Sequence, residues 1–290
     1  MAVKQAFMFP GQGSQQSGMG AELFERYQVE CQLASQLLGY DIVKLCLDED
    51  TTLLNQTRYT QPALYFVSCL AWLEYKQKHP IEETFFLGHS LGLYAALFAA
   101  GYFSLQTGLE IVAKRGALMD EVKDGAMLAV VGEGLEHIED MLTEHEVYDV
   151  DVANYNSPMQ VVLSGKRKGI DKLRKQLKLQ GLRCVSLAVS GAFHSRYMES
   201  ARQAFFDYLM AQDFATPTHQ VISTTNAQWV ERHFLLEELS FQLVQPVRWS
   251  QTIQSLHQRF AGIEYVEIGP GVVLTRLNNQ IAALIGSVNR

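Results

Sequence analysis

The sequence is poor in cysteine, and its few thiols show no pairing pattern. Four cysteines occur in 290 residues, and none of them belongs to a Cys-x-x-Cys motif. Cys31, Cys46, Cys69 and Cys184 lie in or beside apolar runs, as reduced core residues of cytosolic proteins do. The sequence therefore predicts a cytoplasmic protein without a disulfide framework and without a metal site.

Long apolar runs and an excess of positive charge are also missing. No stretch approaches the roughly 20 uninterrupted apolar residues of a membrane-spanning helix. The first apolar run is too short for a signal peptide, and Gly11-Gln12-Gly13 follows it closely. The formal net charge of −7 argues against non-specific binding of nucleic acid. We expect a protein that binds neither membranes nor nucleic acid.

No repeat, low-complexity segment or Gly/Ser/Pro linker divides the chain, and short apolar strands alternate with amphipathic helices. Strands are expected at the start of "KQAFMFPGQGSQ" and at residues 84–88. Helices are expected at residues 21–39, 60–80 and 91–101, and after an N-cap at Ser104. Alternation of this kind predicts a parallel α/β sheet.

The middle of the chain has a different order of elements. Within residues 126–190 the pattern predicts β-α-β-β-α-β, with helices at 135–145 and 168–180 and a last strand at 183–189. This is the order of a ferredoxin-like unit. We therefore predict a large α/β domain, residues 1–125 and 191–290, that carries an inserted ferredoxin-like subdomain, residues 126–190.

The segment Gly88-His89-Ser90-Leu91-Gly92 matches G-x-S-x-G. About one chain of this length in ten would contain such a match by chance. Here a strand leads into the motif and a helix leads out of it, as in the nucleophile elbow of α/β-hydrolase-like folds. The following helix would direct its positive end at an oxyanion. We interpret Ser90 as a nucleophile; the alternative is a tight turn in which Ser90 is only an N-cap.

A serine nucleophile needs a base. The adjacent His89 is a poor candidate, because neighbouring side chains at such a turn point apart. His194 lies where the subdomain ends and an amphipathic helix begins, and such junctions often line clefts. From its position alone, a purely structural role for His194 stays open. The Leu91 N–H is a candidate oxyanion donor, and the Gly11-Gln12-Gly13 loop could supply a second one.

Seven motifs add a resemblance to this reading. In order, they are FPGQGSQ, YTQPALY, GHSLG, KRGALM, GAFHS, QPVRW and EIGPGVVL. The order is that of malonyl-CoA:acyl carrier protein transacylases, which the chain resembles over nearly its whole length. It is most similar to the free-standing, trans-acting acyltransferases of polyketide synthases. The resemblance implies an α/β-hydrolase-like large domain, with Ser90 as nucleophile and His194 as base.

The resemblance also implies roles for further residues. The backbone N–H groups of Gln12 and Leu91 would bind the oxyanion, and the Gln245 carbonyl would orient His194. Phe193 resembles the malonyl-selecting form of its motif, because a ring there leaves little room for a methyl branch; such a clash is worth about 1–3 kcal/mol. Gln61 would be a supporting polar residue, with core packing or capping as the alternative. Asn154 and Asn156 could line the cleft from the subdomain.

Arg115 is unusual on its expected helix. Its neighbours four residues away are Ile111 and Met119, so its side chain emerges on an apolar face. The family has an arginine here that binds the malonyl carboxylate, and a planar guanidinium suits that ligand. One departure is Leu93, where many relatives carry glutamate, which puts the choice between acyl transfer and hydrolysis in doubt.

These residues predict a ping-pong acyltransferase for polyketide or fatty acid synthesis. Malonyl-CoA would acylate Ser90, and the phosphopantetheine thiol of an acyl carrier protein would accept the malonyl group. No bound cofactor and no metal are expected. One alternative is an acyl hydrolase that clears stalled chains from carrier proteins with the same serine and histidine. Another is a non-catalytic scaffold that binds the carrier protein.

A basic segment suggests where the carrier protein would bind. Between Ser164 and Arg183, eight basic residues and one acid give +7 in a chain of net charge −7, so the remainder carries −14. Acyl carrier proteins are acidic, and an acidic enzyme would repel them without a local positive surface. We expect the helix of Lys172, Arg174 and Lys175 to lie beside the cleft mouth and steer the carrier protein. A solvated helix face is the alternative.

Overall fold

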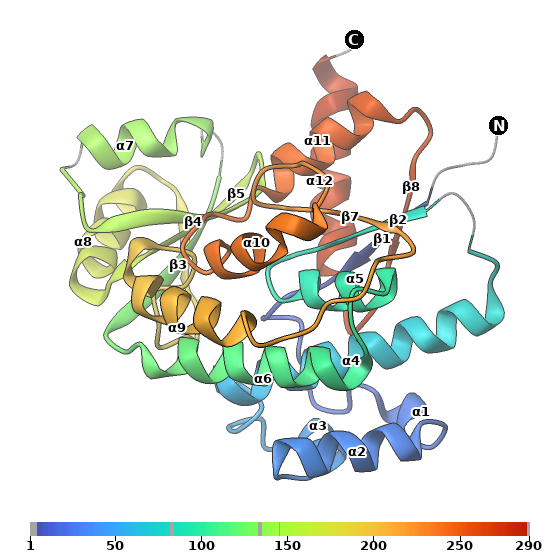
Figure 1. Ribbon diagram of the computed structural model, residues 1–290. Helices are drawn as coiled ribbons and strands as arrows, with labels where there is room; N and C mark the ends of the chain where they lie inside the picture. Colours follow the sequence, from blue (N-terminus) through green and yellow to red (C-terminus); the bar gives the residue numbers. More distant parts are fainter. Residues whose placement is uncertain (1–4, 82–83, 133–134, 145, 289–290) are drawn as a thin grey trace.

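A parallel sheet of four strands forms the centre of the large domain (Figure 1). The structure is a computed structural model that describes residues 5–81, 84–132, 135–144 and 146–288. The strand order is β7-β2-β1-β8, and all three neighbouring pairs are parallel. The bounds are β1 (Gln5–Phe9), β2 (Thr84–Gly88), β7 (Gln220–Ile222) and β8 (Glu264–Glu267). The predicted parallel α/β fold is confirmed.

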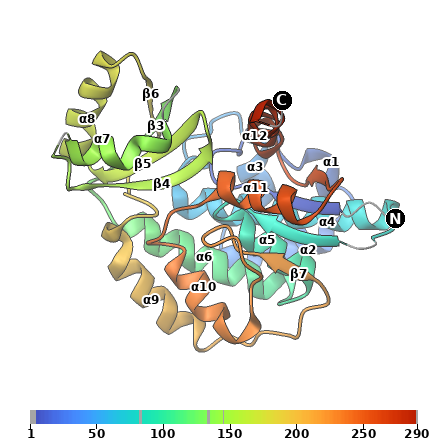
Figure 2. The same ribbon diagram turned by 90° about the horizontal axis from the view of Figure 1, so that it is seen from above.

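Helices cover both faces of this sheet, which explains why its strands are apolar at consecutive positions. Phe7 and Phe9 of β1 belong to the larger core cluster, which includes residues of the helices from α1 to α6 and of α9 and α10. Met8 faces the opposite side and packs in a second cluster with residues of α11 and α12. Figure 2 shows α12 near the top of the view and α10 near its bottom, with strands of the sheet between them. The architecture has three layers.

The helices of the large domain have the following bounds. They are α1 (Ala21–Phe24), α2 (Gln28–Leu38), α3 (Ile42–Leu47), α4 (Thr57–Lys78), α5 (Gly92–Ala100), α6 (Leu105–Glu121), α9 (Glu199–Leu209), α10 (Leu235–Phe241), α11 (Trp249–Arg259) and α12 (Val273–Val288). Two short 3-10 helices are η2 (Arg196–Met198) and η3 (Arg232–Phe234). Within the described part of the chain, no helix is long and apolar enough to span a membrane.

The inserted unit is an antiparallel sheet with helices on one face. Its strand order is β4-β5-β3-β6, which is the order of a ferredoxin-like fold, as predicted. Its elements are β3 (Gly125–Val131), η1 (Leu135–His137), α7 (Ile138–Glu144), β4 (Val150–Ser157), β5 (Gln160–Lys166), α8 (Arg167–Leu179) and β6 (Arg183–Ser186). The change of sheet falls close to the boundaries expected at residues 125/126 and 190/191, which stay a prediction.

Some of the elements predicted from the sequence are longer than those in the structure. The helix predicted for residues 21–39 is two helices: α1 ends at Phe24, and Tyr27 has a non-helical backbone before α2 begins at Gln28. The strand predicted for residues 183–189 ends at Ser186, where its pairing with β3 ends. Lys4 of the predicted first strand and His145 of the predicted helix 135–145 lie outside the described residues.

The basic helix α8 does not lie beside the cleft mouth as the sequence analysis expects. Its buried residues Ile170, Leu173 and Leu177 pack on one face of the small sheet, whereas Met127 and Val162 on the opposite face join the core of the large domain. The apolar side of α8 therefore holds it on the outer face of the subdomain. Arg174 extends to the edge strand β6, where its guanidinium donates to Ser186 Oγ at 3.3 Å.

Candidate active site

Ser90 lies in a strained turn between β2 and α5. Its φ is +52°, a left-handed conformation that is uncommon for a residue with a side chain. A Cβ atom at Gly88 would overlap the backbone of Gly92, and one at Gly92 would overlap the Phe9 carbonyl. The two flanking glycines are therefore required by close backbone contacts. The turn holds the Ser90 hydroxyl at the carboxyl end of the central strands, where α/β sheets bind ligands.

The imidazole of His194 is directed at this hydroxyl. Ser90 Oγ lies 2.7 Å from His194 Nε2. On the other side of the ring, Nδ1 lies 2.8 Å from the Gln242 carbonyl oxygen and 3.2 Å from that of Gln245. Carbonyl oxygens only accept hydrogen bonds, so Nδ1 carries the proton. Nε2 is then the acceptor for the Ser90 hydroxyl, which is the tautomer that a general base needs.

His194 is held in its neutral form. Burial, and after it the positive charge of Arg115, lower its pKa to about 3. The carbonyls of Gln242 and Gln245 act in the opposite direction. The φ of His194 is +56°, so both residues of the hydrogen-bonded pair have strained backbone. Strain at two facing residues is typical of a site whose geometry is fixed by its surroundings.

Arg115 is fully buried beside this pair. It donates to Gln61 Oε1 at 2.8 Å, to Gln242 Oε1 at 3.0 Å and to Ser90 Oγ at 3.2 Å. Its guanidinium carbon lies 5.3 Å from the centre of the Tyr94 ring. These partners are neutral, and Nε has no hydrogen-bond partner among the residues that the structure describes. A buried cation without a counterion costs free energy, so this guanidinium is available to an anionic ligand.

Gln242 is the residue that sequence reasoning missed. Its backbone carbonyl accepts the shorter of the two His194 Nδ1 bonds, and its side chain bonds both Arg115 and the Ser90 carbonyl. It lies at the end of α10, three residues before the Gln245 that the sequence analysis proposes for this role. The Gln245 carbonyl contributes the longer bond. The amide side chain in an apolar helix, just before the QPVRW motif, was the available signal.

The cavity at this cluster is small, about 80 Å³. Its wall combines polar residues of the large domain with apolar residues from both parts of the chain. The lining is Gln12, Gln61, His89, Ser90, Arg115, Met119, Met127, Asn154, Leu187, Val189, Phe193 and His194. A charged group at one end and methionine and aliphatic side chains around it suit a short acyl chain that ends in an anion.

Comparison with known proteins agrees with this geometry. The model of the family described as "Acyl transferase domain" matches residues 6–282. The chain belongs to this acyl transferase family. PksC of Bacillus subtilis (strain 168), a polyketide biosynthesis malonyl CoA-acyl carrier protein transacylase, is 41% identical over 277 residues, with 95% of this chain and 96% of PksC covered. PksE of the same strain, a polyketide biosynthesis protein, is 46% identical, but the matched region spans only 36% of its length.

Solved structures give the same relationship. A malonyl CoA-acyl carrier protein transacylase from Burkholderia pseudomallei has a TM-score of 0.93 and 40% identity, with 97% of this chain and 99% of that chain covered. PlMCAT, a malonyl-transacylase in complex with the type II PKS acyl-carrier protein AntF, has a TM-score of 0.90 and 33% identity, with 97% and 93% covered. The α/β sheet domain with its antiparallel insert is therefore the fold of this transacylase group.

The other residues that the sequence analysis discusses for the site of this acyl transferase domain are Asn154, Asn156 and Leu93. Asn154 lines the cavity, whereas Asn156 Oδ1 lies 2.8 Å from His89 Nε2. His89 is therefore turned toward the small subdomain and not toward the Ser90 hydroxyl. Leu93 is fully buried in the large core. The departure from glutamate at this position exchanges a charged residue for a core residue and does not alter the cavity wall.

A prediction follows from the charge next to His194. The histidine is a base only above its pKa, so inactivation of Ser90 by a fluorophosphonate should lose little rate between pH 8 and pH 5 in the unmodified protein. In Arg115→Gln the neighbouring positive charge is absent, so the pKa of His194 rises and the acid limb of the inactivation rate moves to higher pH. Glu199→Gln, a surface change, is the control. An acid limb that stays in place in Arg115→Gln would show that Arg115 does not act on His194.

Proposed function

We propose that this acyl transferase moves a malonyl group from malonyl-CoA to the phosphopantetheine thiol of an acyl carrier protein. The observation that carries the proposal is the buried Arg115 guanidinium, whose partners are all neutral and which lies 3.2 Å from the Ser90 hydroxyl. A malonyl group places a carboxylate two carbons from the reacting carbonyl. Arg115 can bind that carboxylate while Ser90 reaches the thioester. The transacylase names of PksC and of the solved structures support this choice.

In the first half-reaction His194 Nε2 removes the Ser90 proton as Oγ attacks the thioester carbonyl. The N–H groups of Gln12 and Leu91 would bind the resulting oxyanion; Gln12 lies in the cavity wall and Leu91 directly follows the nucleophile. Collapse of the tetrahedral intermediate breaks the C–S bond. The protonated His194 gives its proton to the departing CoA thiolate, and O-malonyl Ser90 remains.

In the second half-reaction the carrier thiol loses its proton to His194 Nε2 and attacks the ester carbonyl. The C–O bond breaks, Ser90 Oγ takes the proton back from His194, and the malonyl thioester leaves on the carrier protein. The substrate's carboxylate also assists the base. When it pairs with Arg115, the positive charge that lowers the pKa of His194 is compensated, so His194 accepts a proton more readily in the complex than in the free enzyme.

The hydrolase alternative is not favoured. A hydrolase of neutral stalled chains gains nothing from a buried cation, and a cavity of about 80 Å³ leaves no room for a long acyl chain. The cluster of nucleophile, base and carboxylate ligand also argues against a non-catalytic scaffold. The chemistry needs only these side chains and the two substrates, so we expect no bound cofactor. We also propose that the protein acts in the cytoplasm, where malonyl-CoA and carrier proteins are found together.

Intact mass after incubation with malonyl-CoA or acetyl-CoA tests the proposal. The unmodified protein should gain one malonyl group, and Ser90→Ala should gain none. Arg115→Ala should lose about 1.5–3 kcal/mol of malonyl transition-state binding, and its preference for malonyl-CoA over acetyl-CoA should fall. A full adduct on Ser90→Ala would exclude the mechanism. An unchanged malonyl/acetyl preference in Arg115→Ala would exclude the carboxylate role.

The carrier protein would approach across the edge of the small sheet. β6 is the edge strand, Val185 and Leu187 are exposed, and Leu187 also lines the cavity. Arg174 bonds to Ser186, next to Leu187, whereas Lys172 and Lys175 are exposed on α8. We propose that this basic segment attracts the acidic carrier protein, and that Arg174 contributes most because it bonds to Ser186, the neighbour of the cavity residue Leu187.

Charge reversal tests this surface. Changing Lys172, Arg174 and Lys175 together to glutamate should slow malonyl transfer to the carrier protein, most clearly at low salt. Self-acylation by malonyl-CoA should stay unchanged. Among the single variants, Arg174→Glu should slow the transfer more than Lys172→Glu, which carries the same change of charge on the same helix. Carrier kinetics that keep their rate and salt dependence in the triple variant would place the docking surface elsewhere.

A further inference from the structure

The strand β4 of the small sheet contacts the segments that carry His194, Gln245 and Ser90. Its first residues meet the turn that follows His194, and its middle pairs with the segment that follows Gln245. Its end meets His89, the neighbour of Ser90. These three segments come from distant places in the large domain, and β4 contacts each of them.

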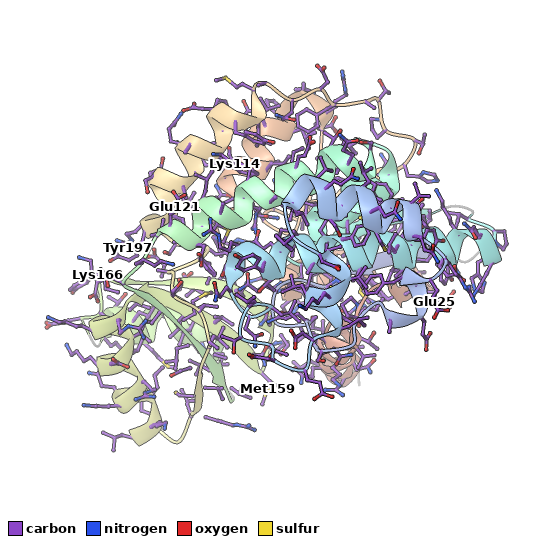
Figure 3. The ribbon with its side chains drawn as sticks, turned by 90° about the horizontal axis from the view of Figure 1, so that it is seen from below. Glu25, Lys114, Glu121, Met159, Lys166 and Tyr197 are labelled. Carbon is purple, nitrogen blue, oxygen red and sulfur yellow. The ribbon has the colours of Figure 1, made fainter. Side chains whose placement is uncertain are left out.

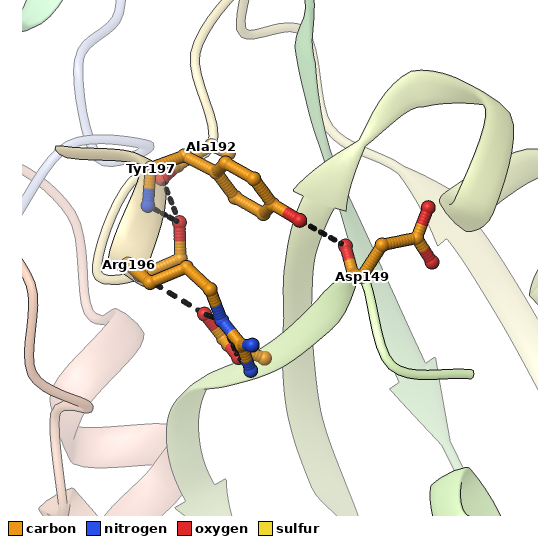
Figure 4. Close-up of polar contacts among 6 residues, drawn as sticks. Asp149, Ala192, Arg196 and Tyr197 are labelled. Carbon is orange, nitrogen blue, oxygen red and sulfur yellow. Dashed lines mark hydrogen bonds and ion pairs between the residues drawn. The ribbon is translucent and has the colours of Figure 1, made fainter. Parts of the chain in front are cut away.

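The turn after His194 is held to β4 by hydrogen bonds and an ion pair (Figure 4). The Asp151 carboxylate accepts from the Arg196 backbone N–H at 3.0 Å and forms an ion pair with the Arg196 guanidinium. The Tyr197 hydroxyl donates to the Asp149 carbonyl at 3.2 Å. Within the turn, Ser195 Oγ donates to the Ala192 carbonyl and accepts from the Tyr197 N–H. The strained His194 lies between these contacts.

The segment that orients the imidazole is held by the same strand. Val247 N–H donates to the Ala153 carbonyl, and Tyr155 N–H donates to the Val247 carbonyl, both at 2.8 Å. Gln245, which accepts from His194 Nδ1, lies two residues before Val247. The backbone that carries His194 and part of the backbone that orients its ring are therefore both bonded to one segment, residues 149–155, which consists of Asp149 and most of β4.

Phe193 and Met198 pack the turn into the large core, and on its outer side the turn borders a cavity. Asp149, Ala192 and Tyr197 line a separate cavity of about 610 Å³ at the junction of the two parts of the chain. Figure 3 shows Tyr197 and Lys166 near each other at this junction, and Lys166 Nζ lies 5.8 Å from the centre of the Tyr197 ring. Where the cavity adjoins the turn, the bond from the Tyr197 hydroxyl to the Asp149 carbonyl links the turn to the segment that leads into β4.

We propose that Asp151, Arg196 and Tyr197 are positioning residues that fix the His194 turn to β4 and so align the base with Ser90. The inference rests on the proposed function, because it concerns the base of that reaction. The contacts are partly exposed: the side chains of Arg196 and Asp151 are 62% and 20% accessible, and such pairs add little to stability. Their effect is on geometry, where a displacement of about 1 Å can cost about 100-fold in rate.

The test is the rate of Ser90 malonylation by saturating malonyl-CoA, measured by quenched-flow intact mass. Each rate is divided by the fraction of protein that is acylated at completion, so that misfolded protein does not count. Asp151→Ala should slow the step about 10-fold or more, and Tyr197→Phe should slow it several-fold. Asp151→Asn keeps one acceptor for the Arg196 N–H and should recover part of the rate. The malonyl-CoA concentration at half-saturation should stay within about 2-fold, because Arg115 and its partners are untouched.

The control is Glu199→Gln, which breaks a comparable surface pair with Arg202 on α9 and should leave the rate unchanged. If Asp151→Ala does not fold, Arg196→Gln takes its place, because it removes the guanidinium and keeps the backbone N–H. The acylation rates of Arg196→Gln and Tyr197→Phe then test the proposal. An unchanged acylation rate in these variants, after division by the acylated fraction, would overturn the proposal. A change seen only in thermal stability, or only in the malonyl-CoA concentration at half-saturation, would overturn it as well. Failure of the unmodified protein to acylate Ser90 would instead overturn the proposed function.

Discussion

A guanidinium that is buried next to the Ser90 hydroxyl and bonded only to neutral groups sets the requirements for the rest of the site. Because Arg115 is charged and desolvated, a protonated histidine beside it is unfavourable, and His194 stays neutral as a base must. The same charge explains why backbone carbonyls orient His194. A carboxylate in that place would lie close to Arg115 and compete with a substrate's carboxylate. Gln242 meets both needs without charge, since its carbonyl accepts from His194 and its side chain accepts from Arg115.

The fold supplies the precision that this arrangement needs. Ser90 and His194 both have left-handed backbone, which is held by its surroundings and not by local preference. For Ser90 the support is the close approach of Gly88 and Gly92 to neighbouring backbone. For His194 it is the turn fixed to β4 and the carbonyls at the end of α10. The inserted subdomain forms one wall of the cavity, and in the proposed mechanism it also positions the base.

Much of this could be predicted from sequence, and the failures have a common cause. The alternation of strands and helices gave the α/β class, β-α-β-β-α-β gave the insert, and the glycines around Ser90 gave the turn. These signals are local. Gln242 was missed because its role depends on where α10 ends relative to His194, which no spacing encodes. The predicted position of α8 was wrong because the apolar face of this helix indicates that it packs on a sheet but does not indicate on which face of the sheet. The hydrogen bonds from β4 to Arg196 and Val247 join segments that are 45 or more residues apart in the sequence, so no local pattern predicts them.

A crystal structure of the O-malonyl enzyme tests the central claim most directly. The account predicts that the malonyl carboxylate accepts hydrogen bonds from the Arg115 guanidinium, including Nε or a nitrogen that now bonds a neutral amide, while the ester carbonyl oxygen faces the Gln12 and Leu91 N–H groups. A carboxylate that points to solvent, or that binds another cation while Arg115 keeps its bonds to Gln61 and Gln242, would contradict it.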